Sequence, residues 1–151
     1  MIGGIIMLIG LIGENCSGKS TLANNIKKHF GAEVITGKDY LRMAKTEQEA
    51  VRLFKERLGN AVKGESIIYI ATEKEQVELL PEEAIKILVK ADLETIKERF
   101  RERMHGNLPM PVEKMLERKH GMFDDGQYDF VYDGTLDDFD LLCEKIGKDL
   151  T

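Results

Sequence analysis

The residues with the clearest chemical meaning lie in one short stretch, GENCSGKST, at positions 13–21. Gly13, Gly18, Lys19 and Ser20 match the spacing G-x-x-x-x-G-K-[ST]. Glycines at such positions let backbone N–H groups wrap around an anion, the lysine neutralises negative charge, and the hydroxyl can coordinate Mg²⁺. The alternative is a glycine-rich turn with a solvated lysine. The stretch predicts a polyphosphate site, because an apolar run precedes it and an amphipathic run follows it.

The whole stretch is expected to hold the phosphates of a nucleotide, ATP or GTP. Nine residues are assigned to this contact: Gly13, Glu14, Asn15, Cys16, Ser17, Gly18, Lys19, Ser20 and Thr21. The sequence contains neither the N-K-x-D tetrapeptide that recognises guanine in switch proteins nor the L-S-G-G signature of transporter ATPases. Both classes are therefore disfavoured, and Mg²⁺ is expected on Ser20.

Cys16 lies inside this stretch and has two interpretations. Nearby amides and Lys19 could lower the pKa of its thiol and make it reactive, in which case bound nucleotide would protect it from alkylation. The other interpretation, which the sequence favours, is a small loop residue without chemistry of its own.

The composition limits the class of protein. A chain of 151 residues suits one domain, and its formal charge of -5 disfavours general nucleic-acid binding. Two cysteines, Cys16 and Cys143, are too few for a disulfide framework or a four-thiolate zinc site.

Residues 1–13 carry no charged side chain but are too short to span a membrane and lack a basic start, so a buried strand is expected there. We expect a cytoplasmic protein without membrane contact, and the sequence is compatible with a monomer and with a homodimer.

Apolar runs alternate with amphipathic stretches along the chain. The expected strands cover residues 5–12, 32–36, 66–71, 85–89 and 128–132, and the expected helices lie at about 20–30, 46–58, 93–104, 112–120 and 139–150. Pro109 and Pro111 are expected to prevent a regular helix between the third and fourth of these helices. The alternation predicts an α/β fold, a three-layer αβα sandwich with a five-stranded parallel sheet, and ligands at the carboxyl ends of its strands.

Four segments together resemble a known family. They are GENCSGKST, TGKDYLR after the second expected strand, the arginines near residues 99–118, and YDFVYDGTLDDF near the end. The chain resembles the P-loop kinases of small molecules, which include adenylate, cytidylate, shikimate and gluconate kinases and polynucleotide kinase domains. The likeness covers nearly all of residues 1–151, and only the first motif is highly specific. It implies a P-loop NTPase fold of the nucleotide-kinase kind with a short lid at about residues 104–120.

Asp39 and Arg42, in TGKDYLR, are expected to bind the phosphoryl acceptor. In adenylate kinases a similar stretch places its arginine on the acceptor phosphate. In polynucleotide-type kinases an acid followed three residues later by arginine binds the acceptor hydroxyl and phosphate. Asp39 could accept a proton from a hydroxyl, and Arg42 could bind a phosphate or carboxylate. An i,i+3 ion pair at a helix start is the structural alternative.

The segment after the third expected strand departs from the adenylate-kinase pattern. It reads ATEKEQVELL, without the acceptor-binding arginine that adenylate-type kinases carry there. Thr72 is expected near the acceptor, and Glu73 could hold the metal through water. The alternative is a helix start in which Thr72 caps and Glu75 reaches back.

Arginines near the expected lid are candidates for stabilising the transferred charge. Arg99 and Arg103 share a helix face, and Arg118 approaches from the second lid helix. His105 and His120 are interpreted as solvated loop residues, and no metal beyond Mg²⁺ is assigned. By resemblance, Gly134 and Thr135, after the last strand, would contact the adenine base.

These assignments combine into one hypothesis of function. The chain is predicted to be an ATP-dependent kinase that uses Mg²⁺, with Lys19, Asp39, Arg99, Arg103 and Arg118 as its catalytic residues. A nucleoside monophosphate is the favoured acceptor, on the strength of TGKDYLR. The alternatives are a hydroxyl acceptor, such as a nucleoside, a shikimate-like or gluconate-like metabolite or a polynucleotide 5'-OH, and a regulatory ATP-binding protein without kinase activity.

Overall fold

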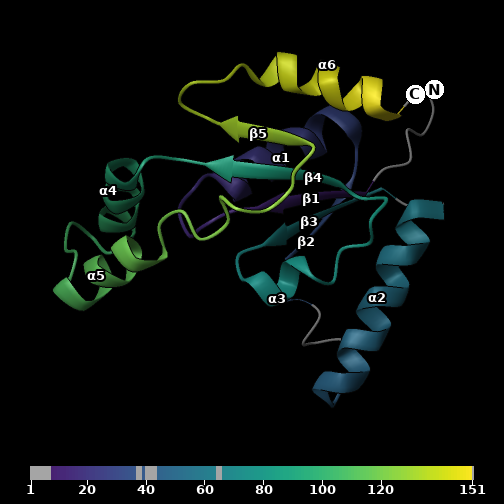
Figure 1. The fold of residues 1–151 in the computed structure, drawn as a ribbon, viewed down its shortest axis with the longest axis horizontal. Coiled ribbons are helices and arrows are strands. Elements are labelled where there is room, and N and C mark those ends of the chain that lie inside the picture. The colour runs from purple at the N-terminus through teal and green to yellow at the C-terminus, as the bar shows by residue number, and fades with distance from the viewer. Residues whose placement is uncertain (1–7, 37–38, 40–43, 64–65, 151) are drawn as a thin grey trace.

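The computed structural model describes residues 8–36, 39, 44–63 and 66–150, and five strands form one parallel sheet in the order β2-β3-β1-β4-β5 (Figure 1). The strands are β1 (Leu8–Ile12), β2 (Glu33–Thr36), β3 (Ile67–Ala71), β4 (Ile85–Lys90) and β5 (Phe130–Asp133). Every residue of β1 and β3 is buried, as their unbroken apolar sequences predict for central parallel strands. The predicted five-stranded parallel sheet is confirmed.

Helices cover both faces of the sheet and complete the predicted three layers. On one face, α1 (Lys19–Phe30) and α6 (Phe139–Leu150) pack through Leu22, Ile26 and Ile146. On the other, α2 (Glu47–Lys63) packs through Phe54 and Leu58, and the segment that contains α3 (Lys74–Val77) adds Leu80. In the part of the chain that the structure describes, no helix has the length and apolar character needed to cross a membrane.

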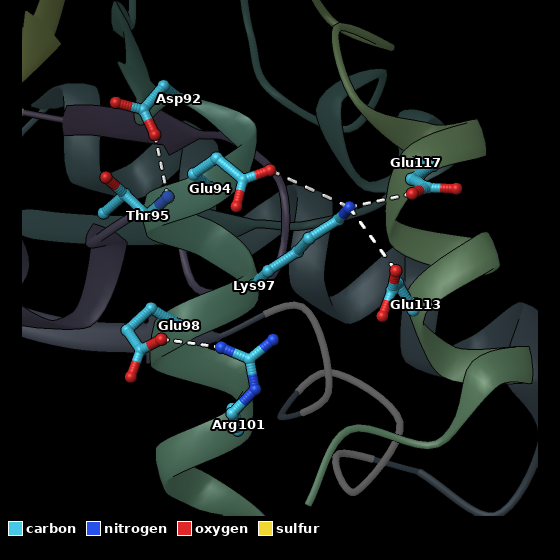
Figure 2. A network of polar contacts seen from close by, with 8 residues as sticks. All are labelled: Asp92, Glu94, Thr95, Lys97, Glu98, Arg101, Glu113 and Glu117. Atoms are coloured by element: carbon cyan, nitrogen blue, oxygen red, sulfur yellow. Dashed lines mark hydrogen bonds and ion pairs between the residues drawn. The ribbon is translucent and has the colours of Figure 1, made fainter.

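Two further helices, α4 (Leu93–Arg103) and α5 (Met110–Lys119), form a hairpin beyond the carboxyl ends of β4 and β5 (Figure 1). They have a hydrophobic cluster of their own, centred on Ile96 and Leu116. Between them lies Lys97, whose side chain is only 11% exposed and whose ammonium is 2.8 Å from Glu117, 3.7 Å from Glu113 and 4.0 Å from Glu94 (Figure 2). The Glu117 hydrogen bond outweighs desolvation and raises the pKa of Lys97, so this charge holds the two helices together.

Several predicted boundaries are corrected by the structure. Helix α5 begins at Met110, although Pro111 was expected to prevent a helix there. The proline lies in the first turn, where backbone N–H groups need no intrahelical partner, so it is tolerated. Strand β5 begins at Phe130 rather than residue 128, and of the first predicted strand residues 5–7 lie outside the described part.

Candidate nucleotide-binding and phosphoryl-transfer site

Strand β1 lies where the chain reverses its direction of travel across the sheet. Its neighbours are β3 and β4, and the chain adds β2 and β3 on one side before it crosses to β4 and β5 on the other. Ligands of open parallel sheets bind at such a point, outside the carboxyl ends of the strands. Residues 13–18 leave β1 there and lead into the amino end of α1, whose dipole favours an anion.

The backbone of this P-loop, residues 13–18, requires small residues at defined positions. A Cβ added at Gly13 would lie 2.5 Å from the Val89 carbonyl oxygen and 2.7 Å from Ser17 Oγ. Gly18 has φ 106° and Cys16 has φ 64°, both in the left-handed region. The loop therefore has a fixed path that a larger residue at position 13 would disrupt.

Two buried polar groups in the P-loop are poorly accounted for by protein contacts alone. Ser17 is 3% exposed, and its Oγ has no hydrogen-bond partner among the described residues. Lys19 is 6% exposed, and its Nζ donates to the Glu14 carbonyl oxygen at 2.5 Å. Orphaned and buried polar groups are costly, so both residues fit a ligand that carries negative charge and acceptor oxygens, as a polyphosphate does.

The pKa of Lys19 is low for a lysine. Burial lowers its pKa to about 8, further lowering comes from Arg103, and the opposing influences of Cys16 and Glu14 are smaller than the effect of burial. An adjacent anion would favour the charged form again. The fraction of Lys19 that is charged near pH 8 should therefore depend on whether an anion is bound in the P-loop.

The environment of Cys16 does not support the interpretation of a reactive thiol. Burial raises the pKa of its thiol, and this outweighs the lowering by Arg103, Lys19 and Arg99. The side chain is 6% exposed and packs in the hydrophobic cluster of the α4–α5 hairpin with Ile96 and Leu116. The hypothesis of an activated thiol is wrong, because the hairpin takes the side chain out of water.

Two hollows meet at the P-loop. The first, which we call the α1–β5 hollow, has a volume of about 570 Å³ and is lined by Cys16, Ser17, Gly18, Thr21, Leu22, Asn25, Val89, Arg99, Glu102, Arg103, Tyr132 and Gly134. The second, the β2–β3 hollow, has a volume of about 440 Å³ and is lined by Asn15, Cys16, Gly18, Lys19, Ser20, Thr21, Thr36, Ile70, Thr72, Glu73, Gln76 and Arg103. Four residues line both: Cys16, Gly18, Thr21 and Arg103.

The predicted lid arginines do not all share one location. Arg99 donates from Nη1 to the Cys16 carbonyl oxygen at 3.0 Å and lines the α1–β5 hollow together with Arg103. Arg103, one turn further along α4, lines both hollows. Arg118 instead lines a separate hollow on α5 with Pro111, and the structure does not bring it together with the other two arginines.

On the predicted acceptor side, Asp39 lies directly beside the wall of the β2–β3 hollow. Its Oδ2 accepts a hydrogen bond from the backbone N–H of Thr36 at 2.8 Å, and Thr36 lines the hollow. Arg42, the partner predicted for it, lies outside the described residues.

Thr72 and Glu73 both line the β2–β3 hollow, together with Ser20. The alternative of a helix start is also present, but it is shifted by one residue. Glu73, not Thr72, is the N-cap of α3, and Gln76, not Glu75, reaches back: its Oε1 accepts from the N–H groups of Thr72 at 2.8 Å and Glu73 at 3.0 Å. Glu73 also lies 3.7 Å from the ammonium of Lys119. Among the described residues no group of three or more His, Cys, Asp or Glu side chains could hold a metal ion by itself.

After β5, only one of the two predicted base contacts lines a hollow. Gly134 lies in the wall of the α1–β5 hollow. Thr135 is not in that wall, and its N–H and hydroxyl both donate to Asp133, at 2.9 and 2.7 Å.

Sequence reasoning missed several residues of both hollows. Asn25, Glu102 and Tyr132 line the first, and Thr36 and Gln76 line the second. Asn25 follows Thr21 by one helical turn, and Thr36 is the last residue of a strand, so helix spacing and strand ends were available signals. His120, interpreted as a solvated residue, has its Nδ1 3.2 Å from Glu14 Oε1, a contact that no local pattern indicates.

Comparisons with solved structures agree with the observed fold. No protein-family model matches the sequence, and no curated protein sequence matches it. Among solved structures, a shikimate kinase from Acinetobacter baumannii bound to shikimate aligns with a TM-score of 0.63 and 14% identity, over 95% of this chain and 92% of that one. A deoxyadenosine kinase from M. mycoides aligns with a TM-score of 0.60 and 19% identity, over 94% and 100%. A gluconokinase from Sinorhizobium meliloti 1021 aligns with a TM-score of 0.59 and 13% identity, over 98% and 93%. This chain therefore has the fold of the P-loop small-molecule kinases.

Proposed function

We propose that the protein is an ATP-dependent kinase that transfers a phosphoryl group to a hydroxyl of a small acceptor. The observation that supports this most is the meeting of two hollows at the P-loop, with Arg103 in the wall of both. A kinase needs two adjoining sites, one for the donor and one for the acceptor, with positive charge where they join. The fold is that of solved shikimate, deoxyadenosine and gluconate kinases.

The donor side is assigned to the α1–β5 hollow and the P-loop. Backbone N–H groups of residues 13–18 and the amino end of α1 bind the phosphates, and Gly134 lies where the base would enter. Mg-ATP supplies the transferable phosphoryl group and neutralises part of its charge. Ser20 would hold the metal directly and Glu73 through water, since both line the same hollow.

The acceptor side favours a hydroxyl over a phosphate. Of the described residues in the β2–β3 hollow, the cations are Lys19 and Arg103, and the proposal assigns both to the donor phosphates. Apart from these cations and the residues of the P-loop and α1, the polar side chains in the wall are Thr36, Thr72, Gln76 and the carboxylate of Glu73, which would repel a phosphate monoester. Asp39, held by the Thr36 N–H, has its second carboxylate oxygen available to accept a hydroxyl proton. The preference for a nucleoside monophosphate depends on Arg42 of TGKDYLR, which lies outside the described residues, so that acceptor is kept as the alternative.

The test is ADP release in a coupled assay with three acceptor panels: nucleosides, small polyols and hydroxy acids, and nucleoside monophosphates. A hydroxyl kinase predicts that one member of the first two panels accelerates ADP formation by orders of magnitude over the rate with water alone. Acceleration by a nucleoside monophosphate alone would move the acceptor assignment back to phosphate. A regulatory ATP-binding protein predicts no acceleration in any panel, with nucleotide binding retained.

A further inference from the structure

Glu14, the second residue of the P-loop, is bound at both of its ends. Its carboxylate accepts a hydrogen bond from the backbone N–H of Gly121 at 3.0 Å through Oε2, and its Oε1 lies 3.2 Å from Nδ1 of His120. Its carbonyl oxygen accepts from Lys19 Nζ at 2.5 Å and from the Ser17 N–H at 3.1 Å. The segment that follows α5 is thereby joined through Glu14 to the lysine of the P-loop.

A negative charge is electrostatically unfavourable at the position of the Glu14 carboxylate. It lies in a loop that is built for an anion, and it faces the carboxyl end of α5, which carries the negative end of a helix dipole. Its side chain is nevertheless only 17% exposed. The specific contacts with Gly121 and His120 are therefore what hold it, and Glu14 lies in the wall of neither hollow.

Other contacts lie at the same junction between the P-loop and the α4–α5 hairpin. Arg99 donates to the Cys16 carbonyl oxygen at 3.0 Å, and the Cys16 side chain packs with Leu116. These contacts fix the middle of the loop, whereas the Glu14 carboxylate fixes its beginning.

We propose that Glu14 is a positioning residue for nucleotide binding: its carboxylate, held by Gly121 and His120, sets the carbonyl to which Lys19 is bound and so keeps the P-loop in its binding shape. The essential feature of Glu14 in this proposal is the side-chain oxygen that accepts from the Gly121 N–H. Glutamine at position 14 also offers an oxygen there and should replace glutamate. This inference rests on the proposed function only in naming the ligand as a nucleoside triphosphate.

The test compares Glu14→Ala and Glu14→Gln with Glu98→Ala, which removes an exposed carboxylate of the same hairpin that pairs with Arg101 and does not touch the P-loop. Calorimetry with ATP and Mg²⁺ measures nucleotide affinity without any acceptor. Alkylation by N-ethylmaleimide, followed by peptide mass spectrometry, measures the exposure of Cys16 against that of Cys143. Both thiols are 6% exposed in the structure, so Cys143, in α6, is an internal control for general unfolding.

Glu14→Ala is expected to weaken ATP binding about tenfold, the loss typical of one hydrogen bond to a charged acceptor, and to speed Cys16 labelling about tenfold with Cys143 unchanged. Glu14→Gln and Glu98→Ala are expected to stay within about threefold of wild type in both measurements. Unchanged affinity and labelling in Glu14→Ala would overturn the proposal, as would equal acceleration at both cysteines or a glutamine variant that behaves like alanine. If wild-type protein binds no nucleotide, the proposed function fails, while the labelling contrast still tests whether Glu14 holds the loop.

Discussion

The two hollows that meet at the P-loop differ in how their chemistry is encoded. In the wall of the α1–β5 hollow, the P-loop residues Cys16, Ser17 and Gly18 form a contiguous run, and the Ser17 hydroxyl has no hydrogen-bond partner among the described residues. The β2–β3 hollow is bounded by Thr36, at the end of β2, and Thr72, after β3, and its described cations are Lys19 and Arg103, of which only Arg103 also lines the other hollow. Under the proposed function, the donor would be recognised by charge and by backbone N–H groups. The acceptor would be recognised by neutral side chains and by the carboxylates of Glu73 and Asp39.

The largest effect should come from removing the buried cation of the P-loop, Lys19. Lys19→Ala is expected to lower kcat/KM by about 10³-fold, because it removes a preorganised charge from the transferring phosphoryl group. It should weaken ATP binding as well, since under the proposed function Lys19 would also contact the phosphates before transfer. Steady-state kinetics and calorimetry measure the two losses separately. Full ATP affinity in this variant would show that the donor phosphates are bound elsewhere.

The acceptor side should respond differently from the donor side. Asp39→Asn is expected to lower kcat by about 10²-fold with an unchanged dissociation constant for ATP, because asparagine keeps an acceptor for the Thr36 N–H but is a poor base. A matched variant, Glu83→Gln, changes an exposed carboxylate outside both hollows and should leave kcat within about twofold. A rate for Asp39→Asn equal to that of wild type would remove Asp39 from the reaction.

The same difference explains what the sequence could predict. The P-loop and the sheet follow from local spacing, because a motif and an alternation of apolar and amphipathic stretches are short-range patterns. The hydrogen bond from Arg99 to the P-loop joins residues 83 positions apart. Glu14 and Gly121 are 107 positions apart, so no spacing rule indicates their contact. The raised pKa of Cys16 depends on burial by the α4–α5 hairpin, and the N-cap of α3 depends on where β3 ends. These features are products of tertiary packing.

The lowered pKa of Lys19 predicts a proton-linked difference between free and bound protein. At pH 8 about half of the free protein should carry a neutral Lys19, since burial lowers its pKa to about 8. Bound phosphate raises that pKa, so binding of Mg-ATP should take up close to half a proton at pH 8 and very little at pH 6. Calorimetry in buffers of different ionisation enthalpy measures this uptake. Lys19→Arg, which does not deprotonate, should show none of it.

Lys19 should also affect the stability of the free protein. Its folded pKa lies below its unfolded value near 10.4, so between about pH 8 and pH 10.4 the unfolded chain binds more protons than the folded one. The free-energy cost of burying Lys19 is therefore largest at neutral pH and declines as the pH rises through this window. Chemical denaturation should therefore find Lys19→Met more stable than wild type at pH 7, with a gap that narrows by about 3 kcal/mol towards pH 10.4. A gap that does not change with pH would mean that Lys19 is not buried as an ammonium.

The smallest effect should come from Cys16, although it lies in the P-loop and in the walls of both hollows. Its side chain packs on Ile96 and Leu116, and burial raises the pKa of its thiol, so it contributes packing rather than charge. Cys16→Ala should lower the free energy of unfolding by about 1 kcal/mol and leave kcat/KM within about threefold. Cys143→Ala, equally buried in α6, should cost a similar amount of stability without any effect on ATP affinity. A loss of activity in Cys16→Ala of 10²-fold or more would show that the thiol acts on the phosphates, because its packing contribution alone is too small to produce such a loss.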